Sequence, residues 1–223
     1  MPSLGIALGM ARPMKASIGP PGILHWKLNE GSSTAITATV GPNGTTDAAW
    51  LTGKSGSGFC LDFNGTDDDA GTSSAVTYGT NTITVCGWFW FDSTAGTRML
   101  FESSESYANT DTFAAFVDTG VLYLANSGTT GTLTKNVAFT TTGAWVHLAF
   151  VLTPTDCKIY VAGVSQVVGT SGSRTGTANY SAQTLFVGAR NRASLFFDGR
   201  IDDLRIYSGD VSANLAAIMA SPQ

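Results

Sequence analysis

The sequence predicts an all-β fold, a two-sheet antiparallel sandwich, and three observations lead to this fold class. Short runs rich in β-branched and aromatic residues recur from Ile23 onward, separated by clusters of Gly, Ser, Thr and Asn. Hydrophobic residues make up 43% of the chain and charged residues only 13%, which suits many short strands joined by tight turns. A length of 223 residues is within the range of one large sandwich, so we expect a single core.

Ten runs have the length and composition of strands, which is enough for two packed sheets. They cover residues 23–28, 57–63, 82–91, 98–103, 112–117, 120–125, 144–153, 156–162, 184–189 and 196–207. In the run 82–91, the odd-numbered residues from Ile83 to Phe91 share one face, whereas Trp88 and Trp90 share the other. Because both faces are apolar toward its end, we expect this strand to be central and covered on each side.

A short helix is expected at the C-terminal end of the chain. Residues 211–219 place Leu215, Ile218 and Met219 on one side of a helix. One terminal helix beside many strands is a closing element of the sandwich and not a helical domain.

Residues 1–22 differ from the rest of the chain and are predicted to be an N-terminal extended docking arm. They hold four of the seven prolines and no acidic residue. Unlike a polar disordered tail, the arm is apolar and gains from burial. We expect it to dock on its own domain, residues 23–223, or on another protein subunit in a homo-oligomer or larger assembly. The apolar residues of this assembly arm are Leu4, Ile6, Leu8, Met10, Met14 and Ile18.

Charge and hydropathy argue against two classes of partner. The net charge is −4 and the twelve Lys and Arg residues are scattered, so no basic surface for nucleic acid is expected. No run approaches the roughly 18 apolar residues of a membrane span. No signal peptide is recognised, because basic residues do not precede the apolar stretch at residues 4–11.

Several segments together carry a family resemblance. They are residues 25–31, 53–68, 82–91, 145–150, 158–163 and 197–207. In this order and spacing they resemble the laminin-G-like jelly-roll domain of the concanavalin-A-like lectin/glucanase superfamily, over about residues 23–220. The resemblance implies a jelly-roll sandwich whose loops and sheet faces serve different roles in different members.

The three cysteines are expected to be core residues and not members of a disulfide framework. Cys60, Cys86 and Cys157 are odd in number, and each lies inside a predicted strand as a small apolar residue would. Free buried thiols are the favoured interpretation, and a Cys60–Cys86 bridge is the alternative.

Catalysis is not expected from the residue pattern. Glycan hydrolases of the superfamily use a carboxylate pair, but Glu102 and Glu105 are three apart and would point to opposite faces of a regular strand. The two histidines, His25 and His147, lie inside predicted strands without a nucleophile motif nearby. We therefore predict a protein that is not an enzyme.

Calcium is the one cofactor that the resemblance suggests, as a structural ion. Glu30 and Asp202 are the candidate metal ligands, because a hard cation prefers carboxylate oxygens. The family's loop often carries a further Asp where Thr39 or Val40 stands in this sequence, which removes a ligand. The favoured alternative is that Glu30 and Asp202 accept hydrogen bonds from backbone donors.

Sugar binding needs an aromatic ring beside polar groups. Trp50, Tyr78, Tyr107 and Tyr180 lie off the apparent core and are the candidate ligand-binding residues.

Three functions compete at this point. The first is a non-catalytic structural or assembly module displayed on a surface, as a virion decoration, fibre or capsid-associated protein anchored by its arm. The second is a lectin-like glycan-binding domain of a secreted or cell-surface protein. The third is a glycan hydrolase or lyase. The expected location is extracellular or on a virion surface.

Overall fold

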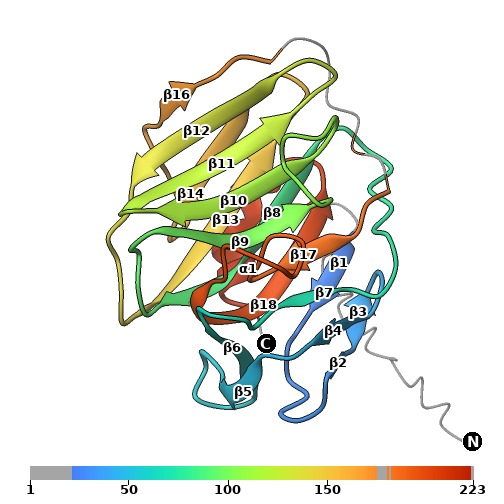
Figure 1. The fold of residues 1–223 in the computed structure, drawn as a ribbon, viewed down its shortest axis with the longest axis vertical. Helices are drawn as coiled ribbons and strands as arrows, with labels where there is room; N and C mark the ends of the chain where they lie inside the picture. Colours follow the sequence, from blue (N-terminus) through green and yellow to red (C-terminus); the bar gives the residue numbers. More distant parts are fainter. Residues whose placement is uncertain (1–21, 175–179, 181, 222–223) are drawn as a thin grey trace, which may run out of the picture.

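The structure, a computed structural model, describes residues 22–174, 180 and 182–221. Within these residues the chain forms two nine-stranded antiparallel sheets that pack face to face as a jelly-roll sandwich (Figure 1). The predicted fold class is therefore confirmed.

The first sheet, sheet A, is built around β8 (Ile83–Phe91), which lies between β13 and β18. Its order is β15 (Val164–Ser165), β14 (Cys157–Val161), β13 (Trp145–Leu152), β8, β18 (Asp198–Ser208), β1 (Gly22–Trp26) and β3 (Ala38–Val40). Off this path, β6 (Phe59–Asn64) pairs with β18, and β5 (Ala49–Thr52) pairs with β6.

The second sheet, sheet B, lies in front of sheet A in Figure 1. Its order is β16 (Gly169–Ser171), β12 (Thr132–Ala138), β11 (Val121–Ser127), β10 (Phe113–Asp118), β9 (Thr97–Ser103), β17 (Leu185–Val187), β7 (Ala70–Thr72), β4 (Gly44–Thr46) and β2 (Ala35–Ile36).

All ten predicted strands are present, with boundaries shifted by a few residues. The structure adds eight strands that the pattern did not predict: β2, β3, β4, β5, β7, β12, β15 and β16. These strands are short or polar, so hydrophobic alternation does not distinguish them from loops.

The core lies between the two sheets and is filled from alternate positions of both. Large side chains with almost no exposed surface include Trp26, Phe63, Phe89, Phe91, Phe101, Phe113, Phe150 and Phe197. These rings pack mainly edge to face, for example Phe91 against Phe197 with centroids 5.2 Å apart.

Among the described residues, a helix covers one end of the outer face of sheet A. There α1 (Leu215–Met219), preceded by the 3₁₀ turn η1 (Ser212–Asn214), buries Leu215 and Ile218 against Cys86 of β8. Within the described residues, the expectation that β8 is covered on each side is wrong for its other end. Trp88 and Trp90 are half-buried there, with Lys54 and Arg200 over their rings and the rings of His147 and Trp145 packed edge to face beside them.

Charged residues are buried beside those tryptophans because β18 carries a β-bulge between Asp202 and Arg205. Asp203, at φ 52°, accepts hydrogen bonds from His25 at 2.8 Å and Arg205 at 2.7 Å. The Nδ1 atom of buried His147 has no hydrogen-bond partner among the described residues.

Cys60, Cys86 and Cys157 are free and buried, as predicted. None of the helices in the described part of the chain is long and apolar enough to cross a membrane.

Candidate functional site

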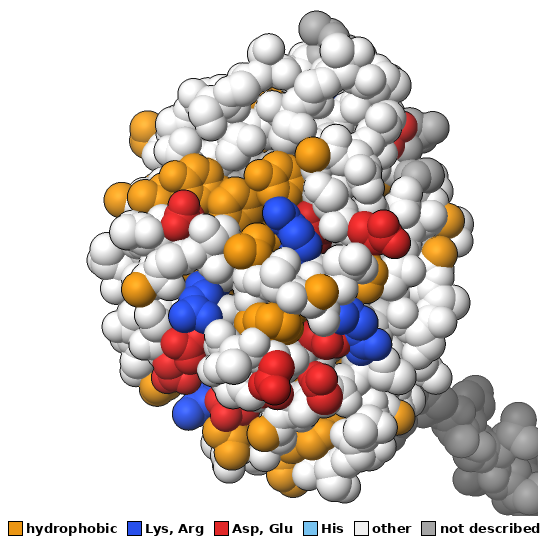
Figure 2. Space-filling model, in the orientation of Figure 1, with side chains coloured by type: hydrophobic (Ala, Val, Ile, Leu, Met, Phe, Trp, Pro, Cys, Tyr) orange, Lys and Arg blue, Asp and Glu red, His pale blue; other side chains and the backbone are white. Residues whose placement is uncertain are grey.

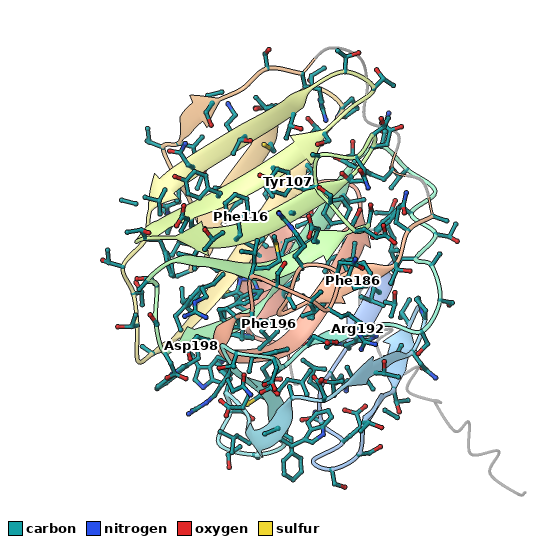
Figure 3. All side chains as sticks on the ribbon, viewed as in Figure 1. Tyr107, Phe116, Phe186, Arg192, Phe196 and Asp198 are labelled. Carbon is teal, nitrogen blue, oxygen red and sulfur yellow. The ribbon has the colours of Figure 1, made fainter. Side chains whose placement is uncertain are left out.

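The outer face of sheet B carries aromatic and charged side chains in place of the polar residues expected on a solvated face. Strand alternation turns Phe113, Ala115 and Val117 of β10 into the core, so Phe116 points outward. The same rule places Glu102 of β9 and Phe186 of β17 on the outer face, where they pair directly across the two strands. Two loops, residues 104–112 and 188–197, add side chains above this face (Figure 3).

Three nearly parallel rings form an aromatic row, which we define as Tyr107, Phe116 and Tyr123. Phe116 and Tyr123 are directly opposite on β10 and β11 and stack with centroids 5.0 Å apart. Tyr107, from the loop 104–112, stacks on Phe116 at 5.6 Å. The guanidinium carbon of Arg190 lies 4.9 Å from the centre of the Tyr107 ring. Figure 2 shows a continuous hydrophobic band across this part of the molecule.

Glu102 fixes the two loops to the sheet. Its carboxylate is fully buried, with Oε1 accepting from the backbone N–H of Tyr107 at 2.5 Å and Oε2 accepting from Arg190 Nε at 3.2 Å. Burial raises the pKa of Glu102, and the neighbouring Arg190 opposes this shift. Because both oxygens are engaged, Glu102 positions Tyr107 and Arg190 rather than facing solvent itself.

A first hollow of about 270 Å³ opens beside Glu102, because its lining includes Phe186, which pairs with Glu102, and Ser104; neither Glu102 nor Arg190 lines it. Its lining combines one aromatic ring with two hydroxyls, two amides and one carboxylate, from Phe186, Ser104, Thr184, Asn109, Gln183 and Glu105. Asn109 Nδ2 donates to Ser104 Oγ at 2.9 Å, and the backbone N–H of Ser104 donates to Thr184 O at 2.9 Å. These bonds hold the loop 104–112 against the end of β17.

A second hollow, of about 240 Å³, lies on the same face and is lined by Thr45, Thr46, Asp47, Asp69 and Arg192. Arg192 Nε donates to Asp69 at 2.5 Å, and Arg192 Nη2 donates to Thr45 Oγ1 at 2.9 Å. Burial raises the pKa of Asp69, and Arg192 opposes this shift. A Cβ atom built on Gly71 would lie 3.5 Å from Arg192 Nε and 3.6 Å from Phe186 Cδ1, so both side chains lie next to Gly71.

Residues 64–215 match the family model of the concanavalin A-like lectin/glucanases superfamily, Laminin_G_3. This segment covers more than half of the chain and contains both sheets' central strands. The chain belongs to this superfamily. No curated protein matches the sequence.

Solved structures with the superfamily fold share little sequence with this chain. One is domain 4 of AbnA, a GH43 extracellular arabinanase from Geobacillus stearothermophilus, in complex with arabinotriose, with TM-score 0.65, 18% identity, and coverage of 88% of this chain and 98% of that chain. Another is the botulinum neurotoxin serotype C1 binding domain, with TM-score 0.66, 12% identity, and coverage of 91% and 52%. This chain therefore spans about half the length of the neurotoxin chain. At these identities the likeness shows the fold alone.

The predicted ligand-binding residues divide into two groups. Tyr107 is half-buried in the aromatic row, and Trp50 is half-buried on β5, where its indole N–H donates to Ser33 O at 2.8 Å. Tyr78 and Tyr180 are each only 3% exposed and pack on Phe113 in the core. The expectation that these two rings lie off the core is therefore wrong, because both pack edge to face on Phe113 and on each other.

The predicted calcium ligands do not form an oxygen cage. Glu30 Oε1 accepts from the backbone N–H of Thr37 at 2.7 Å, and Asp202 Oδ2 accepts from that of Lys54 at 2.9 Å. Each has a second oxygen that is buried without a partner in the described chain. No group of three or more His, Cys, Asp or Glu side chains suited to a metal ion occurs among the described residues. Calcium needs six to eight oxygens, so these residues do not fit the ion.

The predicted arm residues Leu4, Ile6, Leu8, Met10, Met14 and Ile18 lie outside the described residues. The docking arm therefore stays a prediction.

Sequence reasoning missed Phe116, Phe186, Arg190 and Arg192 as site residues. Phe116 could have been found, because in a strand of alternating core positions it is the one large apolar residue that points outward. Arg190 and Arg192 could not have been found in this way, because their carboxylate partners are 88 and 123 residues away in the sequence.

Proposed function

We propose that this lectin-like domain binds glycans without cleaving them, and that the first hollow and the aromatic row are its binding site. The observation that carries the proposal is the composition of the first hollow, in which Phe186 lies among five polar side chains. A sugar ring has C–H faces that pack on aromatic rings and hydroxyls that both donate and accept hydrogen bonds. The hydroxyls and amides of this hollow offer both functions.

The site's rigidity supports the same function. Tyr107 and Arg190 are held by the buried carboxylate of Glu102 before any ligand arrives, so little loop ordering remains to be done on binding. The Nε atom of Arg190 is occupied by Glu102, whereas its two terminal NH₂ groups make no hydrogen bond to the described residues. They are therefore free to donate to a sugar hydroxyl.

Sugar ligands are known for two of the structural neighbours. The AbnA domain was solved in complex with arabinotriose, and cell entry of botulinum neurotoxin type C depends on interaction with two ganglioside molecules. These ligands belong to those proteins. They make a carbohydrate the first ligand class to test on this chain.

The non-catalytic part of the proposal is supported by Glu102. A hydrolase needs a carboxylate free to protonate a leaving group or attack a sugar, but both Glu102 oxygens are engaged by Tyr107 and Arg190. We expect no release of reducing ends from any glycan that binds. Turnover that disappears in Glu102→Gln would overturn this part of the proposal.

The binding test uses the full chain on a glycan array, followed by calorimetric titration with the best neutral ligand. Asn109→Ala and Tyr107→Ala should each weaken binding about ten-fold or more, the equivalent of one lost hydrogen bond or ring contact. Phe59→Ala is the matched control, because Phe59 is an exposed ring (40%) on β6 of the other sheet and should leave affinity unchanged. Binding that none of these variants alters would place the site elsewhere.

The assembly role, as a surface-displayed virion, fibre or capsid-associated module in an extracellular setting, stays a second proposal. Its support is the apolar composition of residues 1–22, most of which lie outside the described residues. Self-association of the full chain that is lost on removing residues 1–21 would support it. A monomeric full chain would remove it.

A further inference from the structure

Arg190 and Arg192 come from one turn and reach opposite sides of Phe186. Asn191 and Arg192 both have left-handed backbone conformations, with φ 48° and 56°. The turn therefore directs Arg190 to Glu102 beside the first hollow, and Arg192 to Asp69 in the second hollow. Figure 3 shows Phe186 lying between Tyr107 and Arg192 on this face.

The two hollows repeat the same chemistry. Beside the first hollow and in the lining of the second, an arginine Nε is bound to a carboxylate that is largely or fully buried. Each hollow is also lined by two hydroxyl side chains. The hydroxyls come from Ser104 and Thr184 in the first hollow and from Thr45 and Thr46 in the second. Two similar sites on one face, separated by one aromatic ring, suit a ligand with a repeating structure.

The spacing requires more than one repeat unit. Phe186 pairs with Gly71, which pairs with Thr45, so Phe186 and Thr45 are two strands apart on the same face. With neighbouring strands about 4.8 Å apart, that separation is about 10 Å. A single sugar ring is too short to fill the first hollow and also reach Thr45 in the second, whereas an oligosaccharide is long enough.

The charge of the face selects the kind of oligosaccharide. Both arginines are already neutralised, Arg190 by Glu102 and Arg192 by Asp69. The remaining charges in the two linings are the carboxylates of Glu105 and Asp47. An acidic sugar would meet uncompensated negative charge in both hollows, which costs about five-fold or more in affinity at contact distance.

We propose that the two hollows are subsites for one uncharged oligosaccharide, whose chain crosses Phe186 between the Arg190 and Arg192 pairs. This inference rests on the proposed glycan-binding function. It adds the second hollow, the minimum length of the ligand and its charge class.

The test is calorimetric titration of the full chain with sugar series of one to five units. The uncharged probes are α-1,5-linked arabinose, β-1,4-linked xylose and β-1,4-linked glucose, and the acidic probe is α-1,4-linked galacturonic acid. For at least one uncharged series we expect affinity to rise about ten-fold or more at the length that reaches the second hollow. The galacturonic acid series should bind about five-fold more weakly or not at all.

Two variants separate the subsites. Arg192→Lys keeps the charge but loses the planar fork, so it should reduce the affinity of the longer sugars to that of the shorter ones and leave the shortest bound sugar unchanged. Asp47→Asn keeps an acceptor for the Asp69 N–H while removing a charge, and should improve binding of the galacturonic acid series only. Thermal unfolding of both variants confirms that they are folded.

The outcomes are distinguishable. Binding that does not depend on length, or an equal loss for all lengths in Arg192→Lys, would overturn the two-subsite inference while leaving the glycan-binding function in place. Tighter binding of galacturonic acid than of every uncharged series would overturn the charge class. A chain that binds no sugar at all would remove both the function and the inference.

Discussion

Glu102 and Arg190 form an ion pair in which the Glu102 side chain is fully buried while the Arg190 side chain is 29% exposed. The pair thus connects the interior of the outer-face site to its surface. Its buried member supports the loop 104–112, and its exposed member covers the Tyr107 ring. The first prediction follows from this asymmetry.

Glu102→Ala should destabilise the domain by about 2–4 kcal/mol, because it leaves the Tyr107 N–H and the Arg190 guanidinium without their partner. Glu102→Gln keeps an acceptor for Tyr107 and should cost less, about 1 kcal/mol. Urea unfolding at pH 7 measures both values. Equal stability of Glu102→Ala and the parent chain would show that the pair does not hold the loops.

His147 predicts a loss of stability in acid. Burial lowers the pKa of His147 to about 4, below the unfolded value of about 6.5. The unfolded chain therefore binds more protons between these values, so the contribution of His147 is present above pH 6.5 and lost as pH falls toward 4. His147→Phe should remove about 2 kcal/mol of the change in unfolding free energy between pH 7 and 4.5. An unaltered pH profile in this variant would contradict the assignment.

Asp202 predicts the opposite dependence. Burial raises the pKa of Asp202 to about 6, so the native state favours its protonated form, and this contribution is lost as pH rises through 6. Asp202→Asn should stabilise the domain by about 1–3 kcal/mol at pH 8 and by much less at pH 4. The control is Asp62→Asn, since the Asp62 carboxylate is 29% exposed and paired with Arg200. A gain of equal size in both variants would show that burial of Asp202 is not the cause.

Replacing Gly188 by alanine should destabilise the domain through a clash in the core, and Gly56 provides a matched control. Gly188 and Gly56 have nearly the same left-handed φ, 76° and 74°. A Cβ atom on Gly188 would lie 2.3 Å from the ring of Phe63, whereas one on Gly56 has open space. Gly56→Ala should therefore cost only about 1 kcal/mol of backbone strain, and Gly188→Ala about 3 kcal/mol or more. Unfolding midpoints in urea compare the two variants directly, and similar values would rule out the clash.

The long strands of the fold were predictable from sequence, and the site was not. Runs such as 82–91 and 145–152 carry enough alternating apolar residues to mark a strand by themselves. Short strands such as β4 and β7 carry Gly and Thr, and they are recognised as strands only by their pairing with other short segments, β2 and β17 and each other, which local sequence does not reveal. The outer-face site is assembled from β9, β10, β11, β17 and two loops, so its pairs depend on the register between segments far apart in the chain.

The burial of individual tyrosines was also not predictable from sequence. Tyr107, Tyr78 and Tyr180 all occur in polar, loop-like sequence, yet only Tyr107 reaches the outer face. Which loop folds back over the core is decided by packing between the sheets. Composition alone does not carry that information.

Because one ten-residue connection, 188–197, carries both Arg190 and Arg192, the two sheets form a fixed support for a loop whose sequence can be varied. A combinatorial library restricted to the exposed positions of that connection, with Gly188, Ala189 and Phe197 unchanged, would sample new ligand preferences at both hollows at once. Every strand that buries the core would keep its parental sequence, so selected clones should retain the melting behaviour of the parent.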